Sequence, residues 1–110
     1  MYKLIIVDDE PRVREQLGKF IEWETLDIEL VRTFSNGKEA FSFMQKNKVD
    51  IVISDIKMPV MSGLELAAAC HKLNPQIQFV IISAYRDFEF AKTAMQQHVT
   101  DYVLKPVKYN

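Results

Sequence analysis

Short runs of apolar residues recur along this chain, separated by stretches with helical spacing. Nearly all-apolar, β-branched runs of this length are typical of buried parallel strands. We predict such strands over 3–8, 50–54, 78–82 and 100–104. Residues 28–35 instead alternate between apolar and polar positions, which predicts a less buried strand at an edge of the sheet.

The segments between these strands carry helix signals. Pro11 suits the first position of a helix, and Val13, Leu17, Phe20 and Ile21 then form one apolar stripe. Further helices are expected to begin at Asn36, at Ser62 and at Asp87. Their capping or inward-facing residues are Glu39, Ala40, Phe41 and Met44 for the first, Glu65 for the second, and Phe88, Ala91, Ala94 and Met95 for the third. The helix that follows Ser62 should run to about Leu73 and end at Asn74-Pro75.

Five strands thus alternate with four helices, and parallel crossovers of this kind are right-handed. The order predicts one α/β domain, doubly wound, with helices on both faces of the sheet. Only residues 106–110 follow the fifth strand. We therefore expect a chain that stops before a final helix. The sheet face that this leaves uncovered should be covered by another chain, an exchanged segment or crystal packing.

Composition narrows the class of protein. The chain has 110 residues, 48% hydrophobic and 26% charged, and a net charge of −1. These values fit one soluble domain, and they give no reason to expect attraction to nucleic acid or membranes. No run is long enough to cross a bilayer, and the N-terminus does not resemble a signal peptide. Cys70 is the one cysteine, so a reduced, cytoplasmic setting is expected, and His71 and His98 lack the spacing of a zinc site.

Charged and polar residues stand where the predicted strands end. They are Asp8 and Asp9, Asp55, Ser83 and Lys105. Parallel strands present their carboxyl ends at one edge of the sheet, which is where open α/β sheets bind ligands. Any of these residues alone has a simpler interpretation as a helix cap, a turn residue or a surface charge. Their occurrence at successive strand ends favours a shared site.

The residue types indicate what chemistry that site could perform. Clustered carboxylates raise each other's pKa, so the acidic trio implies either a divalent metal or a catalytic acid/base pair. Oxygen ligands suit Mg²⁺, with Asp8 and Asp9 best placed to hold it. Lys105 could contact a phosphate oxygen and Ser83 could donate a hydroxyl. Asp55, alone at its strand end, would be the nucleophile of a phosphoryl-transfer site.

Several motifs together resemble the receiver domain of two-component response regulators. They are 7–10, 55–59 with 62–63, 83–84 and 102–106, in family order and covering the chain from end to end. Two more stretches, 20–23 and 85–92, are similar to receivers that precede an AraC-type DNA-binding domain.

The resemblance implies a flavodoxin-like fold with strand order 2-1-3-4-5. It implies that Asp55 accepts a phosphoryl group from a sensor histidine kinase. Asp9, Asp55 and the backbone carbonyl of Lys57 would bind Mg²⁺ directly, with Asp8 acting mainly through water. Lys105 and Ser83 would contact the phosphoryl oxygens.

The resemblance also implies how the signal would leave the site. Tyr102 would turn inward as Ser83 moves, which changes the face of the fourth helix and fifth strand where such domains form homodimers. The phosphorylated domain would control an output domain that binds DNA, and the receiver itself would not bind DNA. Lys57 and Tyr85 occupy positions that tune the phosphate lifetime, and the bond between residues 105 and 106 is expected to be cis.

One residue departs from the family pattern. Val60 stands where many relatives have glycine, in the loop after Pro59. A β-branched residue is costly there if the position requires a positive φ, so this loop is expected to differ.

Two other functions are alternatives to the phospho-acceptor. A Mg²⁺-dependent phosphohydrolase would place its nucleophile on the first strand with a second Asp two residues on, whereas Asp8 and Asp9 are adjacent and Glu10 follows them. Such an enzyme would turn over a phosphomonoester. A degenerate receiver that serves only for docking would not respond to acetyl phosphate and Mg²⁺.

Overall fold

The computed structural model describes residues 1–84, 96 and 99–105. They form a five-stranded parallel sheet of order β2-β1-β3-β4-β5, which confirms the predicted topology. The elements are β1 (Tyr2–Val7), α1 (Pro11–Phe20), the 3₁₀ helix η1 (Trp23–Leu26), β2 (Ile28–Phe34), α2 (Gly37–Met44), β3 (Ile51–Ser54), α3 (Gly63–Leu73), β4 (Gln78–Ser83) and β5 (Asp101–Leu104).

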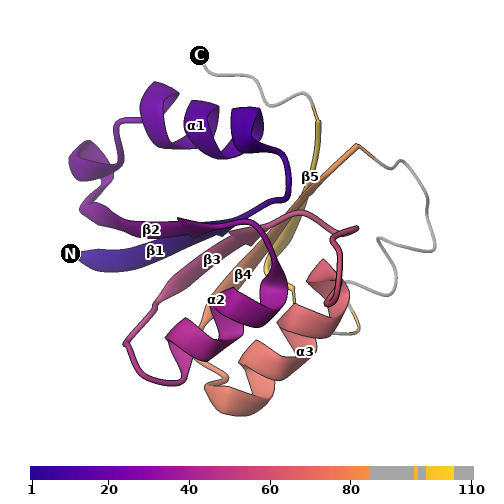
Figure 1. Cartoon of the computed structure of the whole chain (residues 1–110). Helices are drawn as coiled ribbons and strands as arrows, with labels where there is room; N and C mark the ends of the chain where they lie inside the picture. Colours follow the sequence, from indigo (N-terminus) through magenta and orange to yellow (C-terminus); the bar gives the residue numbers. More distant parts are fainter. Residues whose placement is uncertain (85–95, 97–98, 106–110) are drawn as a thin grey trace.

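Helices cover both faces of the sheet, with α1 on one side and α2 and α3 on the other (Figure 1). The strand β1 shows how the sequence supports this arrangement, because its successive side chains point to opposite faces. Leu4 and Ile6 enter the core beneath α1, while Ile5 and Val7 enter the core beneath α2 and α3. All four side chains are fully buried, which explains the unbroken apolar run in the sequence.

The expected helix caps for α2 and α3 are confirmed. The Asn36 side chain accepts a hydrogen bond from the Glu39 backbone N–H at 2.9 Å. Ser62 and Glu65 form a full capping box, with both hydrogen bonds at 3.1 Å. These bonds satisfy backbone N–H groups that the first turn of a helix leaves without a carbonyl. They place the beginnings of both helices at the carboxyl edge of the sheet.

The strand β2 lies at a sheet edge, as predicted, but a bulge interrupts the alternation of its side chains between the two faces of the sheet. The pairing with β1 shifts register between Leu4 and Ile5, so that an extra residue, Val31, is accommodated on β2. Ile28 and Leu30 pack beneath α1, whereas Phe34 packs with the core on the opposite face. The bulge therefore moves Phe34 to the other side of the sheet.

The apolar stripe predicted for α1 is wrong at its last turn. Leu17 is buried, but Phe20 is 55% exposed. Helix α1 ends at Phe20, and the chain turns extended at Ile21. Ile21 and Trp23 pack against the core beside Leu17, and the Trp23 indole N–H donates to the Leu17 carbonyl at 3.0 Å. These two side chains cover the core where Phe20 was expected.

Some predictions fall outside the described residues. The helix expected to begin at Asp87, the stretch 85–92 and the bond between residues 105 and 106 belong to this group. In the part of the chain that the structure describes, none of the helices is long and apolar enough to cross a bilayer.

Candidate functional site: an acidic pocket at the carboxyl edge of the sheet

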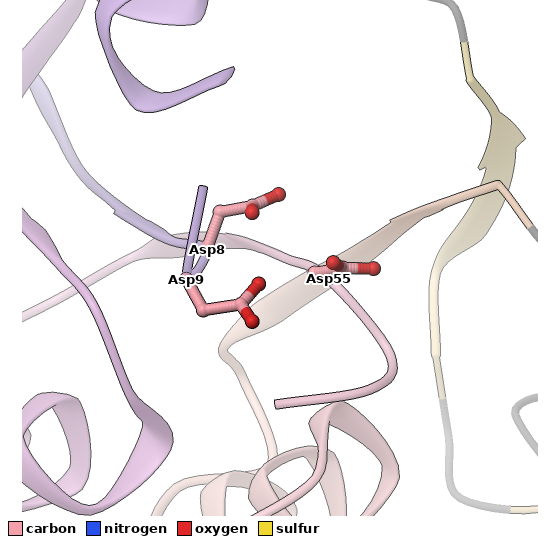
Figure 2. Close-up of side chains that lie close together, drawn as sticks. All are labelled: Asp8, Asp9 and Asp55. Atoms are coloured by element: carbon pink, nitrogen blue, oxygen red, sulfur yellow. The ribbon is translucent and has the colours of Figure 1, made fainter. Parts of the chain in front are cut away.

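The sheet register brings three carboxyl groups together. Strands β1 and β3 are neighbours and end side by side, with Val7 opposite Ser54. The residues that follow them, Asp8 and Asp9 on one strand and Asp55 on the other, have carboxylate oxygens within 4.8 Å of one another. Figure 2 shows these three side chains lying close together.

Asp8 is held at each of its polar groups. Its Oδ1 accepts the backbone N–H of Glu10 at 2.9 Å, and its Oδ2 lies 3.2 Å from the Lys105 ammonium. Its backbone carbonyl accepts a hydrogen bond from Arg14 Nη1 at 2.6 Å. Because Asp8 is also buried, its carboxyl group has little freedom to reorient.

Asp55 is positioned mainly by backbone contacts. Its N–H donates to the carbonyl of Val7 at 2.9 Å, and its Oδ1 accepts the N–H of Ile56 at 2.7 Å. The beginning of α3 packs closely on this turn, because the Gly63 N–H donates to the Ile56 carbonyl at 2.7 Å. A Cβ atom at Gly63 would collide with the backbone carbonyl of Asp55. Glycine is thus the residue that allows α3 to begin this close to Asp55.

Lys105 reaches the site from the far edge of the sheet. Its backbone N–H donates to the carbonyl of Ser83 at 2.8 Å, which places it just beyond β5 and level with the end of β4. Its ammonium group lies 3.2 Å from Asp8 and 3.3 Å from Asp55. One cation therefore bridges carboxylates that follow two different strands.

Burial and charge shift the acidities of these groups. Burial raises the pKa of Asp8 and the pKa of Asp55, although backbone hydrogen bonds and Lys105 oppose the shift. Burial acts to lower the pKa of Lys105, but the two neighbouring carboxylates together outweigh it and hold that pKa above its ordinary value. The ammonium group is therefore a permanent positive charge of the site at neutral pH.

The donor set fits a hard divalent cation. Three carboxylate groups cluster here, and the Lys105 ammonium pairs with two of them, those of Asp8 and Asp55. Asp9 is exposed and lies outside the two ion pairs of Lys105. A pocket of about 220 Å³ opens at this point, lined by Asp9, Glu10, Asp55, Lys57, Ala84 and Lys105. Oxygen ligands beside a small open pocket match Mg²⁺, which keeps several waters and binds phosphate oxygens.

The predicted convergence of Asp8, Asp9, Asp55 and Lys105 is confirmed. Ser83 is fully buried at the end of β4, and its backbone carbonyl accepts the hydrogen bond from the Lys105 N–H. Tyr102, on β5, is half-buried against the core beneath α2 and α3. The chemical roles predicted for these residues remain predictions.

Two contacts of the site were not anticipated from the sequence. Glu10 lines the pocket and donates its backbone N–H to Asp8, and Arg14 binds the Asp8 carbonyl. A short Asp-Asp-Glu-Pro loop before a helix could have pointed to the first contact, because aspartate side chains often accept the N–H two residues on. Nothing in the sequence pattern marks the second.

Comparison with known proteins identifies the family. The response regulator receiver domain profile matches residues 4–110. This chain belongs to the response regulator receiver domain family. It is 41% identical over 106 residues to the uncharacterized transcriptional regulatory protein YesN of Bacillus subtilis, covering 96% of this chain and 29% of YesN. It is 38% identical to the transcriptional regulatory protein HptR of Staphylococcus aureus, over 99% of this chain and 42% of HptR.

Solved receiver structures agree with the fold. The receiver domain of AraT, a response regulator from Geobacillus stearothermophilus, superimposes with a TM-score of 0.90 at 33% identity, over 97% of this chain and 83% of that one. A LuxR-family DNA-binding response regulator from Staphylococcus aureus superimposes with a TM-score of 0.86 at 28% identity. The match covers 99% of this chain and 90% of that one. The receiver fold is thus flavodoxin-like with strand order 2-1-3-4-5.

Membership of the family establishes the general function. Receiver domains are phosphorylation-controlled switches of two-component signalling; they generally bind Mg²⁺ at an acidic pocket and interact with histidine kinases and output domains. This chain is such a regulatory domain. The chain spans less than half the length of these curated relatives, 29% of YesN and 42% of HptR.

Proposed function

We propose that Asp55 is the residue that accepts the phosphoryl group, from a sensor histidine kinase. The observation that carries this proposal is the placement of Asp55 beside the acidic pair Asp8 and Asp9 and beside Lys105, at the wall of a small open pocket. A carboxylate oxygen of Asp55 would form a bond to phosphorus as the bond to the histidine nitrogen of the kinase breaks, which yields an acyl phosphate.

The residues around Asp55 have separate tasks in this reaction. Asp9, Asp55 and the backbone carbonyl of Lys57 would bind Mg²⁺, with Asp8 acting through a water. The cation would neutralise charge on the transferred group. The Lys105 ammonium already lies 3.3 Å from the Asp55 carboxylate. After phosphorylation it would donate a hydrogen bond to a phosphoryl oxygen instead.

The signal would leave the site through β4 and β5. The Ser83 hydroxyl would bond to a phosphoryl oxygen, and Tyr102 would turn inward toward the space that Ser83 leaves. Two charge-assisted hydrogen bonds, at roughly 1.5–3 kcal/mol each, can supply much of the ~5.5 kcal/mol that reverses a two-state equilibrium. The face that includes β5 would then support a homodimer.

The wider setting is also a proposal. We place residues 1–110 as a receiver domain within a cytoplasmic transcription regulator. The similarity of 20–23 and 85–92 to certain receivers favours an AraC-type DNA-binding output domain. The chain would promote its own phosphorylation and dephosphorylation and no other reaction.

Mass spectrometry after treatment with acetyl phosphate and Mg²⁺ tests the acceptor. We expect one added phosphate on the wild type and none on Asp55→Asn. Asp27→Asn is the matched control, because Asp27 is an exposed aspartate in a left-handed conformation that asparagine also adopts, and it should label like the wild type.

Other outcomes point elsewhere. Equal labelling of Asp55→Asn and the wild type would contradict the assignment of Asp55. No labelling of any variant would favour a docking module, and steady turnover of a phosphomonoester would favour a phosphohydrolase.

A further inference from the structure

The loop that joins β1 to α1 carries Asp8 and Asp9, two of the three carboxyl groups of the proposed metal site. This loop is only three residues long. Asp8, Asp9 and Glu10 fill it. The Glu10 side chain does not cap α1, and Pro11 cannot donate a backbone N–H at the helix start. The caps that fix α2 and α3 at this edge therefore have no equivalent on α1. Besides the backbone bond from the Arg14 N–H to the Glu10 carbonyl, a side chain connects the loop to the helix.

Arg14 provides that connection from the second turn of α1. Its Nη1 donates to the Asp8 carbonyl at 2.6 Å, the first carbonyl beyond the end of β1. Hydrogen bonds from a charged donor are stronger than those between neutral groups. The other end of the loop is held as well, because the Glu10 N–H donates to Asp8 Oδ1.

Asp9 lies between these two points of attachment. Its own carboxyl group is exposed, so its direction depends on the backbone of the loop more than on side-chain packing. Losing the Arg14 bond would allow the peptide between Asp8 and Asp9 to rotate. The Asp9 carboxylate would then spend less time within reach of Asp55.

We infer that Arg14 is a positioning residue for divalent-cation binding, which orients Asp9 through the backbone carbonyl of Asp8. The inference rests on the proposed Mg²⁺ site. Groups that orient metal ligands commonly change metal affinity by about ten- to a hundredfold when they are removed. We expect about tenfold, because Arg14 acts through a backbone group.

A second effect of Arg14 has the opposite sign. Its guanidinium is a positive charge close to an acidic pocket, and removing a cation there should strengthen Mg²⁺ binding. Weaker binding in Arg14→Ala would thus reveal positioning, whereas tighter binding would reveal simple electrostatics. Arg12 is a matched control, since it is exposed on the same helix and within the described residues makes no hydrogen bond to the loop.

The experiment measures the Mg²⁺ dissociation constant by calorimetric titration of the wild type, Arg14→Ala, Arg14→Lys and Arg12→Ala. We expect about tenfold weaker binding for Arg14→Ala, partial recovery for Arg14→Lys, and less than a twofold change for Arg12→Ala. Phosphorylation by acetyl phosphate at saturating Mg²⁺ should recover in Arg14→Ala. Should Arg14→Ala fail to fold, Arg14→Met keeps the apolar stem and carries the same expectation.

The results separate this inference from the function on which it rests. Arg14→Ala that binds Mg²⁺ as tightly as Arg12→Ala, or more tightly, would overturn the positioning role alone. A wild type that does not bind Mg²⁺ would instead overturn the proposed metal site. Loss of phosphorylation that saturating Mg²⁺ does not restore would also count against positioning.

Discussion

The ammonium group of Lys105 lies 3.3 Å from the carboxylate of Asp55, although 50 positions separate the two residues in the chain. The contact exists because β4 lies between β3 and β5 and pairs with both. The register of these pairings brings the carboxyl ends of β3 and β5 to the same edge of the sheet. Lys105 also bridges to Asp8, 3.2 Å away. The balance of charge at the site therefore depends on a residue that directly follows β5.

Replacing Lys105 by methionine should separate metal binding from phosphoryl transfer. The variant keeps an apolar stem but removes the positive charge that pairs with Asp8 and Asp55. Mg²⁺ should bind severalfold more tightly, because the pocket becomes more negative. Phosphorylation by acetyl phosphate should become slower by roughly a hundredfold, the order of loss seen when one stabilising donor is removed. Calorimetry and the rate of labelling measure the two effects.

Lys105→Arg is the control for this experiment. It keeps the positive charge in a different shape, so Mg²⁺ affinity should stay near that of the wild type. Weaker Mg²⁺ binding in Lys105→Met would show that Lys105 supports the site structurally rather than as a charge.

Asp8→Asn should stabilise the metal-free domain at neutral pH. Burial raises the pKa of Asp8 above its ordinary value of 3.8. Protonated Asp8 therefore adds to the free energy of unfolding. This contribution is fully present below the pKa that Asp8 has in the unfolded chain, and it is lost as pH rises through the higher pKa that Asp8 has in the folded domain. Asparagine stays neutral at every pH and can still accept the Glu10 N–H. We expect a gain on the order of 1 kcal/mol at pH 7 that shrinks toward pH 3.

Urea unfolding in EDTA at several pH values measures this gain. Asp27→Asn, at an exposed position, is the matched control and should change the free energy of unfolding little. An Asp8→Asn domain that is less stable than the wild type at pH 7 would mean that the ion pair with Lys105 outweighs the cost of burial.

The sheet and its acidic edge could be predicted from the sequence because they depend on simple periodicities. Buried strands leave apolar runs, and parallel strands end at one edge, so Asp8, Asp55 and Lys105 had to meet. The caps at Asn36 and Ser62 were equally readable, since each bond joins residues three positions apart.

Features that depend on packing between distant segments could not be predicted. The bulge opposite Leu4 and Ile5, which turns Phe34 to the other face, depends on how β2 fits against β1. Phe20 shares the helical spacing of buried neighbours, but the helix ends there and Trp23 covers the core. Arg14 meets Asp8 because of the path of the loop, which no periodicity encodes.

Gly63→Ala should destabilise the domain strongly. The added Cβ would collide with the Asp55 carbonyl, which is backbone and cannot move aside without shifting the acceptor loop. We expect a loss of about 3 kcal/mol or more in urea unfolding, together with weaker Mg²⁺ binding. Gly18→Ala is the matched control, because its Cβ meets only the end of the Leu30 side chain at 3.2 Å. That helix-interior change should cost little or even stabilise. Equal stabilities of the two variants would contradict the close approach at Gly63.

The loop after Asp55 holds a strained residue. Val60 has a φ of 72°, so this valine adopts the positive φ that suits glycine, and the cost expected for a β-branched residue at such a position applies. The Met61 N–H donates to the Pro59 carbonyl at 2.8 Å, which closes a three-residue turn around Val60. Val60 is 80% exposed, so packing does not repay the strain.

Val60→Gly should therefore stabilise the domain. Left-handed conformations cost residues other than glycine roughly 1–2 kcal/mol, and glycine loses part of this advantage through its more flexible unfolded chain. We expect a net gain of about 0.5–1 kcal/mol in urea unfolding. Val60→Ala removes the β-branch but keeps a Cβ, so its stability should lie between those of the wild type and Val60→Gly. Val60→Gly that is less stable than Val60→Ala would show that the turn around Val60 is not strained.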